Sequence, residues 1–198
     1  HFAIKAIRDN KPITYVLNGD FEKDFMGQYK QSRFTGYGFG PETQKMCGFP
    51  HFKNVEFDGE FPIATLNFKD DKFPADVTMT AFNPFIPNDS KNSSIPAAFF
   101  EIEVTNTTEE TLKYQIALSV ANPYTSHNEA KKKDGYQMLS FYNSGEDKSS
   151  LGYGDLTIAT DCDKTYTQTY WYRGGWQDKI VTYWNDFNNI ENLKERIY

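Results

Sequence analysis

The feature that most constrains this chain is the repeated alternation of apolar and polar residues along short segments. Phe100, Ile102 and Val104, for example, alternate with Glu101 and Glu103. Successive side chains of a β-strand point to opposite faces, so a period of two predicts a strand with one buried face. Segments of this kind, or short apolar runs bounded by turn residues, occupy residues 2–7, 13–17, 61–68, 76–82, 97–105, 111–121, 136–142, 156–160 and 165–172.

These closely spaced strands predict an all-β fold, specifically an antiparallel β-sandwich of two packed sheets. The helical pattern is confined to residues 185–198, where Ile190, Leu193 and Ile197 recur at positions i, i+3 and i+7. We therefore expect a short C-terminal helix at most. The length of 198 residues fits one domain, residues 1–198, which can bury roughly 70% of the surface of its unfolded chain.

Three segments between the strands are interpreted as turns or loops. Residues 57–60 contain Gly59, for which a positive φ is expected. Residues 106–110 are interpreted as a hairpin-like connection between two strands. Residues 122–135 contain three consecutive lysines, which predict a solvated loop tip rather than a phosphate or membrane site.

Charge and hydropathy argue against several classes of function. The chain has 21 Lys and Arg against 27 Asp and Glu, and the resulting net charge of −6 disfavours nucleic-acid binding, because phosphate would be repelled. Aromatic residues make up 17% of the sequence, which argues against disorder. No apolar run approaches the ~20 residues of a spanning helix, so no membrane span is predicted.

No residue pattern predicts a catalytic, metal or cofactor site. His1, His51 and His127 lie far apart, and neither Cys47 nor Cys162 belongs to a CxxC motif. The two cysteines are interpreted as separate core residues or free thiols. A GxSxG nucleophile motif and a phosphate-binding loop are both missing from the sequence. We therefore predict no catalytic residue, no metal and no cofactor.

The most unusual local feature is an aromatic cluster in residues 170–176, followed by Trp184. Flat aromatic rings pack against sugar rings and a guanidinium bonds hydroxyls, so Trp171, Arg173, Trp176 and Trp184 are candidates for glycan contact. The alternative is a core or domain-interface cluster, because Trp buries a large area and its N–H finds a partner. The sequence leaves both interpretations open and favours packing.

Several short motifs occur along the chain. They are GEFPIATL at residues 59–66, FP at 73–74, AFNPFIP at 81–87, SSIPAAFFE at 93–101, GYGFGP at 36–41 and YWYRGGW at 170–176. The first four, by their order and spacing, resemble the N-terminal domain of glycoside hydrolase family 116. That family includes the non-lysosomal glucosylceramidase and bacterial and archaeal β-glucosidases. The opening residues 1–6 and the last two motifs resemble bacterial members, so the resemblance covers nearly the whole chain.

The resemblance implies a two-part protein in which an N-terminal β-sandwich precedes a larger (α/α)₆ catalytic domain. In the family both catalytic carboxylates belong to the second domain, so no catalytic residue is carried over to this sequence. Residues 1–198 are accordingly expected to be a truncated, inactive fragment of a retaining β-glycosidase. Its implied partners are its own C-terminal catalytic domain and, through that domain, a β-glycoside substrate.

Residues 83–96 are the first candidate for an interface with the catalytic domain. Prolines there fix φ and lower the entropic cost of docking. The candidate residues are Pro84, Phe85, Ile86, Pro87, Asp89, Ser93 and Ser94. A self-packed crossover between sheets is the alternative, and in the interface interpretation the domain also helps to shape the substrate entrance.

Two other functions remain open at the level of sequence. One is a free-standing carbohydrate-binding module that uses the aromatic cluster, and the other is an adhesion or scaffold sandwich. No signal peptide is visible, which favours a cytoplasmic location, although the chain begins without Met. The sugar, the aglycone and the oligomeric state do not follow from the sequence.

Overall fold

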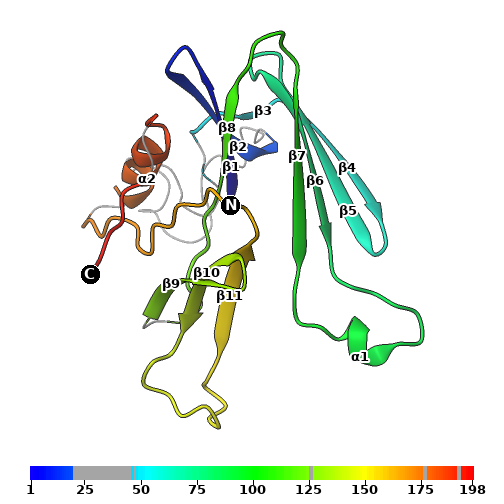
Figure 1. Ribbon diagram of the computed structural model, residues 1–198, viewed down its shortest axis with the longest axis vertical. Helices are drawn as coiled ribbons and strands as arrows, with labels where there is room; N and C mark the ends of the chain where they lie inside the picture. Colours follow the sequence, from blue (N-terminus) through cyan, green and yellow to red (C-terminus); the bar gives the residue numbers. More distant parts are fainter. Residues whose placement is uncertain (20–45, 47, 125–126, 176–177, 191–192) are drawn as a thin grey trace, which may run out of the picture.

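The computed structural model describes residues 1–19, 46, 48–124, 127–175, 178–190 and 193–198. Within these residues the chain forms eleven strands, arranged in three sheets, and two helices (Figure 1). The predicted all-β sandwich is confirmed, and a third sheet is added to the two that were expected. Among the described helices, none is long and apolar enough to cross a membrane.

The first sheet has the strand order β3-β2-β1-β8. Its strands are β1 (Phe2–Arg8), β2 (Lys11–Gly19), β3 (His51–Phe52) and β8 (Lys113–Leu118). β1 pairs antiparallel with β2 and β8, whereas β2 and β3 run parallel. The middle of β1, from Ala3 to Ala6, is buried on both faces.

The second sheet has the order β4-β5-β6-β7 and is antiparallel throughout. Its strands are β4 (Asn54–Glu60), β5 (Ile63–Lys69), β6 (Ala75–Phe82) and β7 (Phe99–Asn106). The alternation predicted for β6 is confirmed, because Ala75, Val77 and Met79 are buried and the residues between them are not. Met79 lies between Leu66 and Ile102 of its neighbours.

The main core lies between these two sheets. Ile4 and Ala6 of the first sheet pack with Phe68 and Val77 of the second. An aromatic group closes one end of this core, with ring centroids 5.2–5.5 Å apart; its members are Tyr15, Phe52, Phe68 and Phe73. These are favourable separations for tilted and edge-to-face rings.

The other face of the first sheet is covered by helix α2 (Lys179–Phe187). Ile180, Tyr183, Trp184 and Phe187 are its buried residues and pack with Ala3 and Val16. Lys5, which is fully buried, donates a hydrogen bond of 2.8 Å to the Phe187 carbonyl and another to the Asn189 carbonyl. A strand residue therefore binds the last carbonyl of α2 and one just beyond its end, where the helix dipole favours positive charge.

The third sheet has the order β11-β10-β9. Its strands are β9 (His127–Lys133), β10 (Tyr136–Tyr142) and β11 (Asp155–Thr160). The lysines of residues 131–133 were predicted to occupy a loop tip, which is wrong, because they lie in edge strand β9. They are nevertheless exposed, and lysines on an edge strand oppose pairing with a further chain.

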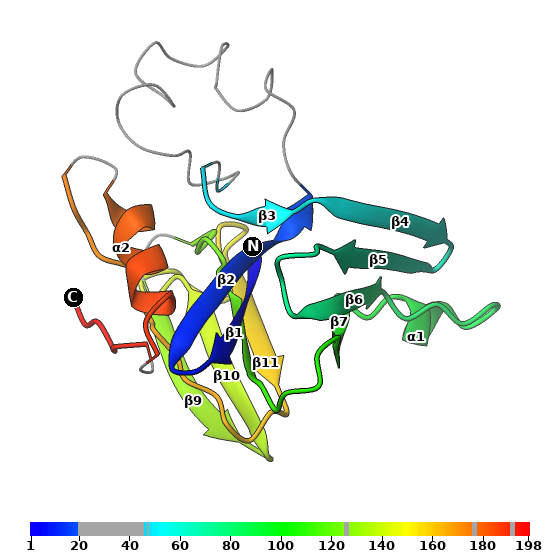
Figure 2. The same cartoon turned by 90° about the horizontal axis from the view of Figure 1, so that it is seen from above.

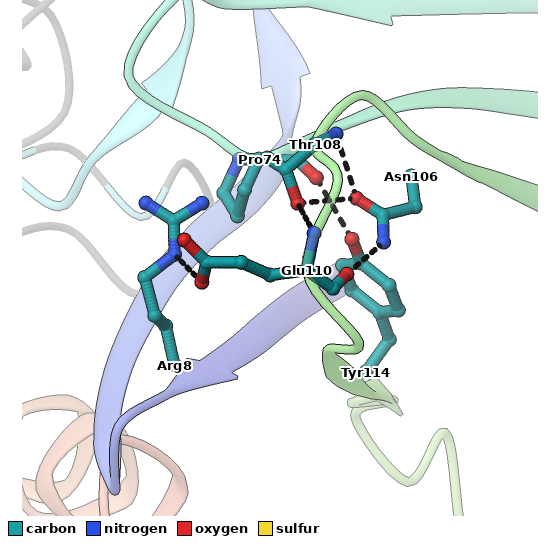
Figure 3. A network of polar contacts seen from close by, with 6 residues as sticks. All are labelled: Arg8, Pro74, Asn106, Thr108, Glu110 and Tyr114. Atoms are coloured by element: carbon teal, nitrogen blue, oxygen red, sulfur yellow. Dashed lines mark hydrogen bonds and ion pairs between the residues drawn. The ribbon is translucent and has the colours of Figure 1, made fainter.

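A polar network joins the second sheet to the first at the connection between β7 and β8 (Figure 3). The Arg8 guanidinium forms an ion pair of 3.0 Å with Glu110, and Tyr114 donates a hydrogen bond of 2.8 Å to the Pro74 carbonyl. Asn106 accepts bonds from the N–H and hydroxyl of Thr108 and donates to the Glu110 carbonyl. Residues 106–110 therefore cross from one sheet to the other and do not form the predicted hairpin.

Three further expectations for local structure are corrected. Residues 57–60 lie in β4 and pair with β5, and Gly59 is absent from the positive-φ residues. Residues 165–172 form no strand, because their backbone follows an irregular path beside α2. The expected C-terminal helix is present, but it covers residues 179–187 instead of 185–198, since its apolar face is formed by earlier residues.

The second sheet extends beyond the first (Figures 1 and 2). Its far end carries the β4–β5 turn and the connection from β6 to β7, which contains the short helix α1 (Ser90–Ser93). Core packing is thus confined to one half of this sheet. The other half presents both of its faces outside the sandwich.

Candidate functional site

Two of the tryptophans predicted to contact glycans pack around helix α2. The Trp184 side chain is 8% exposed, and its ring centroid lies 4.4 Å from that of Phe49. Trp171 stacks on Tyr183 with a centroid distance of 4.4 Å and an interplanar angle of 14°. Both rings therefore have an aromatic neighbour in the core between α2 and the first sheet.

Arg173 has a different environment from these tryptophans. Its side chain is exposed, and its guanidinium lies 5.0 Å from the Tyr170 ring centroid and 4.7 Å from that of Tyr198. The Arg173 backbone N–H donates a 3.2 Å hydrogen bond to the Tyr198 hydroxyl. Trp176 lies outside the described residues. The four predicted glycan contacts are thus not seen together, and glycan contact stays a prediction.

The predicted interface segment, residues 83–96, is ordered by its own hydrogen bonds. Asp89 caps α1, because its carboxylate accepts bonds of 3.0 Å from the Asn92 N–H and 2.5 Å from the Asn92 side chain. These two hydrogen bonds lower the pKa of the Asp89 carboxyl. Ser93 exchanges bonds with the backbone of Ile86, and the Ser94 hydroxyl donates to the Ser90 carbonyl.

The apolar residues of the same segment point outward. Phe85 and Ile86 are about half exposed, and Ile95 is similarly exposed. The polar candidates Asp89, Ser93 and Ser94 therefore shape the loop, whereas Phe85 and Ile86 are available for contact. An exposed apolar loop with internally satisfied polar groups is what a docking surface requires.

The loop continues an exposed apolar surface on the outer face of the second sheet, the face opposite the core. Ile63, Phe82 and Phe99 form one cross-strand row, because Phe82 lies opposite both of the others. All three side chains are exposed, and the Phe82 and Phe99 rings stack at 5.2 Å. Phe61, which is 77% exposed, meets Phe85 edge to face at 5.0 Å.

The inner face of the same half-sheet is also apolar where the first sheet no longer covers it. Phe57 is 69% exposed and Phe100 is 51% exposed, and both lie on the face that holds Leu66 and Met79. The Phe57 ring lies over Gly59, where an added Cβ would come within 2.8 Å of it. A side chain at position 59 would therefore require the exposed Phe57 ring to move.

A solvent-open hollow of about 410 Å³ lies at the β4–β5 turn. Its lining consists of Asp58, Glu60, Phe61, Pro62, Ile63 and Thr65. Within the described part of the chain, the carboxylates of Asp58 and Glu60 form no hydrogen bond or ion pair. The hollow places negative charge directly beside the apolar surface.

The loop of residues 83–96 was predicted from the sequence, but the other exposed apolar residues of this half-sheet were not. These are Phe57, Phe61, Ile63, Phe82, Phe99 and Phe100. A signal was present, because Phe99 and Phe100 are consecutive, and consecutive strand residues point to opposite faces. Two adjacent aromatic residues therefore indicate a strand that is apolar on both sides. Within the described residues, no three His, Cys, Asp or Glu side chains are grouped as metal ligands.

Comparison with known proteins gives one family. The sequence model described as beta-glucosidase 2, glycosyl-hydrolase family 116 N-term, matches residues 1–196. A search of curated proteins gives no match. The family match covers both the sandwich and the apolar half of the second sheet.

Proposed function

The chain belongs to the family of N-terminal domains of glycosyl-hydrolase family 116, and on that basis we propose that it is a non-catalytic domain supporting a glycoside hydrolase's catalytic domain. The match over residues 1–196 is the observation that carries this proposal. In this proposal residues 1–198 act as one domain of a longer protein. The reaction, hydrolysis of a β-glycoside with retention, belongs to the catalytic domain.

Two acidic residues of the domain have structural tasks. The pKa values of Asp89 and Asp147 are lowered, in each case by hydrogen bonds from a nearby residue, Asn92 or Ser149. Such bonds favour the ionised carboxylate. These two carboxylates therefore hold turns of the domain together.

The loop of residues 83–96 is the proposed contact with the catalytic domain. Pro84 and Pro87 restrict the backbone, and Phe85 and Ile86 present exposed apolar side chains. Asp89, Ser93 and Ser94 keep the loop in shape through the bonds described above. An ordered loop loses little entropy on docking, which supports its use at an interface and at the rim of a substrate entrance.

A free-standing carbohydrate-binding module is not favoured. Such a module would present a coplanar aromatic strip to solvent, whereas Trp184 is buried and Trp171 is stacked on Tyr183. Within the described residues, Arg173 with Tyr170 and Tyr198 is an exposed group at which a glycan contact could form.

The proposal is tested with residues 1–198 beside the full-length protein from which they come. Both are incubated with aryl β-glucosides and β-xylosides, and residues 1–198 are titrated against a glycan panel. We expect hydrolysis by the full-length protein alone and no glycan binding by residues 1–198. Hydrolysis by residues 1–198 would contradict the proposal, and glycan binding without hydrolysis would instead support the module.

A second experiment tests whether residues 84–96 in particular contact the catalytic domain. In the full-length protein, residues 84–96 are replaced by a Gly-Ser linker of equal length, and the exposed segment 144–153 is replaced in the same way in a matched variant. We expect the first replacement to lower activity and melting temperature and the second to leave both unchanged. Equal effects of the two replacements would remove the loop from the proposed interface.

A further inference from the structure

The far half of the second sheet holds most of the net charge of the chain. We define the acidic arm as residues 56–67 and 78–103, which comprise this half-sheet and its connecting loop. The arm contains six carboxylates and one lysine, Lys91, and thus has a net charge of −5, against −6 for the whole chain. The six are Glu56, Asp58, Glu60, Asp89, Glu101 and Glu103.

The strand register places five of these carboxylates along two edges of one face. Glu60 pairs with Ile63 on the outer face, so Glu56, Asp58 and Glu60 follow the β4 edge of that face. Glu101 and Glu103 follow the β7 edge, opposite Thr80 and Thr78. β4 and β7 are three strand spacings apart, so the two acidic edges are separated by about 14 Å.

Between these edges the outer face carries the short polar side chains of Thr65, Asn67, Thr78 and Thr80. The outer face nearer the tip of the arm, and the inner face, are apolar. The outer face carries the row of Ile63, Phe82 and Phe99, and the inner face carries Phe57 and Phe100. A sheet face in contact with water is normally polar. Exposed apolar side chains on both faces of a sheet indicate that a partner surface contacts both faces.

We infer that the acidic arm inserts into a groove of the catalytic domain whose walls are apolar on both sides and whose outer rim carries two rows of Lys or Arg. This inference rests on the proposed function, which supplies the partner. The apolar walls contact the inner and outer faces of the arm. The cationic rows lie along the β4 and β7 edges.

The charge of the arm decides against other occupants. A symmetric dimer formed through this face would set one arm of net charge −5 against another, and like charges would face each other without compensation. An anionic lipid surface is disfavoured by the same repulsion. A cationic protein groove is the occupant that satisfies both the charge and the two apolar faces.

The base of the arm is fixed, which suits insertion as a rigid element. Phe68 and Val77 are fully buried where the arm leaves the core. The ion pair of Arg8 with Glu110 holds the adjoining β7–β8 connection against the first sheet, and the Tyr114 hydrogen bond holds the start of β6 there through the Pro74 carbonyl (Figure 3). A preorganised arm loses little conformational freedom on docking.

Photocrosslinking in the full-length protein tests the inference. A photoreactive benzoylphenylalanine replaces Phe61 on the outer side in one variant and Phe57 on the inner side in another, with Leu151 as the control position outside the arm. Phe57 and Phe61 are 69% and 77% exposed, and Leu151 is 108% exposed, so none of the substitutions disturbs a core. We expect crosslinks from both arm positions, but not from position 151, to different walls of one catalytic-domain groove.

Charge reversal provides the second measurement. Glu60→Lys and Glu101→Lys place a cation on each acidic edge, and Glu146→Lys, in an exposed segment outside the arm, is the matched control. We expect the first two variants to lower crosslink yield at position 61 at least tenfold and the control to leave it unchanged. Crosslinks to a second copy, crosslinks from one face alone, or yields insensitive to charge would each overturn the inference.

The proposed function fails under a different result. If the catalytic domain keeps its full activity and melting temperature after residues 1–198 are removed, the supporting role is refuted. If removal abolishes activity while the arm crosslinks elsewhere, the supporting role stands and the inserted arm does not. Removal of residues 1–198 tests the supporting role, and crosslinking from the acidic arm tests its insertion, so the two proposals can fail independently.

Discussion

Lys5 permits a quantitative prediction, because its ammonium group is buried between the first sheet and helix α2 and, among the described residues, pairs with no carboxylate. Its side chain donates to the carbonyls of Phe187 and Asn189. Desolvation, together with the smaller effect of the nearby charge of Lys113, lowers the pKa of Lys5 from its ordinary value of 10.5 to about 8. The protonated form is therefore less favourable in the folded protein than in the unfolded chain.

The sign of the pH dependence follows from proton binding. Between pH 8 and 10.5 the unfolded chain holds the Lys5 proton and the folded protein releases it, so the free energy of unfolding rises with pH. The difference between the two pKa values corresponds to about 3.4 kcal/mol, which is the full cost of burying the charge at low pH. Between pH 7 and pH 9.5, about 2 kcal/mol of that cost is relieved.

The assay compares the unaltered chain with Lys5→Met in urea at pH 7 and pH 9.5, followed by tryptophan fluorescence. Methionine has a similar length and does not titrate, so the other ionisable groups cancel in the difference between the two proteins. We expect the stability of the unaltered chain, relative to the variant, to rise by about 2 kcal/mol between the two pH values. If the difference in free energy of unfolding between the unaltered chain and Lys5→Met stays constant or falls as the pH rises, the Phe187 and Asn189 carbonyls compensate fully for the desolvation of Lys5. That result would refute the reasoning.

Two further predictions concern the core and the joint between the sheets. Trp184→Ala should lower the free energy of unfolding by about 3–5 kcal/mol in urea, because it removes a buried ring that packs on Phe49, whereas Leu151→Ala should change it by less than about 0.5 kcal/mol. Equal effects would place Trp184 outside the core. Tyr114→Phe should cost about 1 kcal/mol by calorimetry, since it leaves the buried Pro74 carbonyl without its 2.8 Å donor (Figure 3); an unchanged melting temperature would mean that water replaces the hydroxyl.

Strands with one buried face were predicted well, because alternation is a local property of the sequence. β6 follows its predicted alternation, and in β7 Ile102 and Val104 are partly covered as predicted, whereas Phe100 on the same face is exposed. Strands without such a face were missed or misread. β9, with the sequence HNEAKKK, is an exposed edge strand and has no apolar alternation to detect.

The candidate sites show the same division. The loop of residues 83–96 was found from its prolines and apolar residues, which are visible in the sequence. The surface that it extends was not found, because Phe61, Phe82 and Phe99 come from separate segments brought together by the register of the second sheet. The aromatic cluster near the C-terminus was also visible in the sequence, but only the tertiary structure shows that one of its members is covered. Helix α2 buries Trp184 against the first sheet.

The sequence by itself determined that this protein is an acidic β-sandwich of one family, because alternation, charge and motif order are all written along the chain. The tertiary structure alone decided which side chains are covered. The first sheet overlies half of the second, so apolar residues of the same face, such as Val77 and Phe100, are buried at one end and exposed at the other. The burial of a side chain on the second sheet depends on whether the first sheet packs against it. The position of the first sheet is set by the β7–β8 connection, which crosses from one sheet to the other.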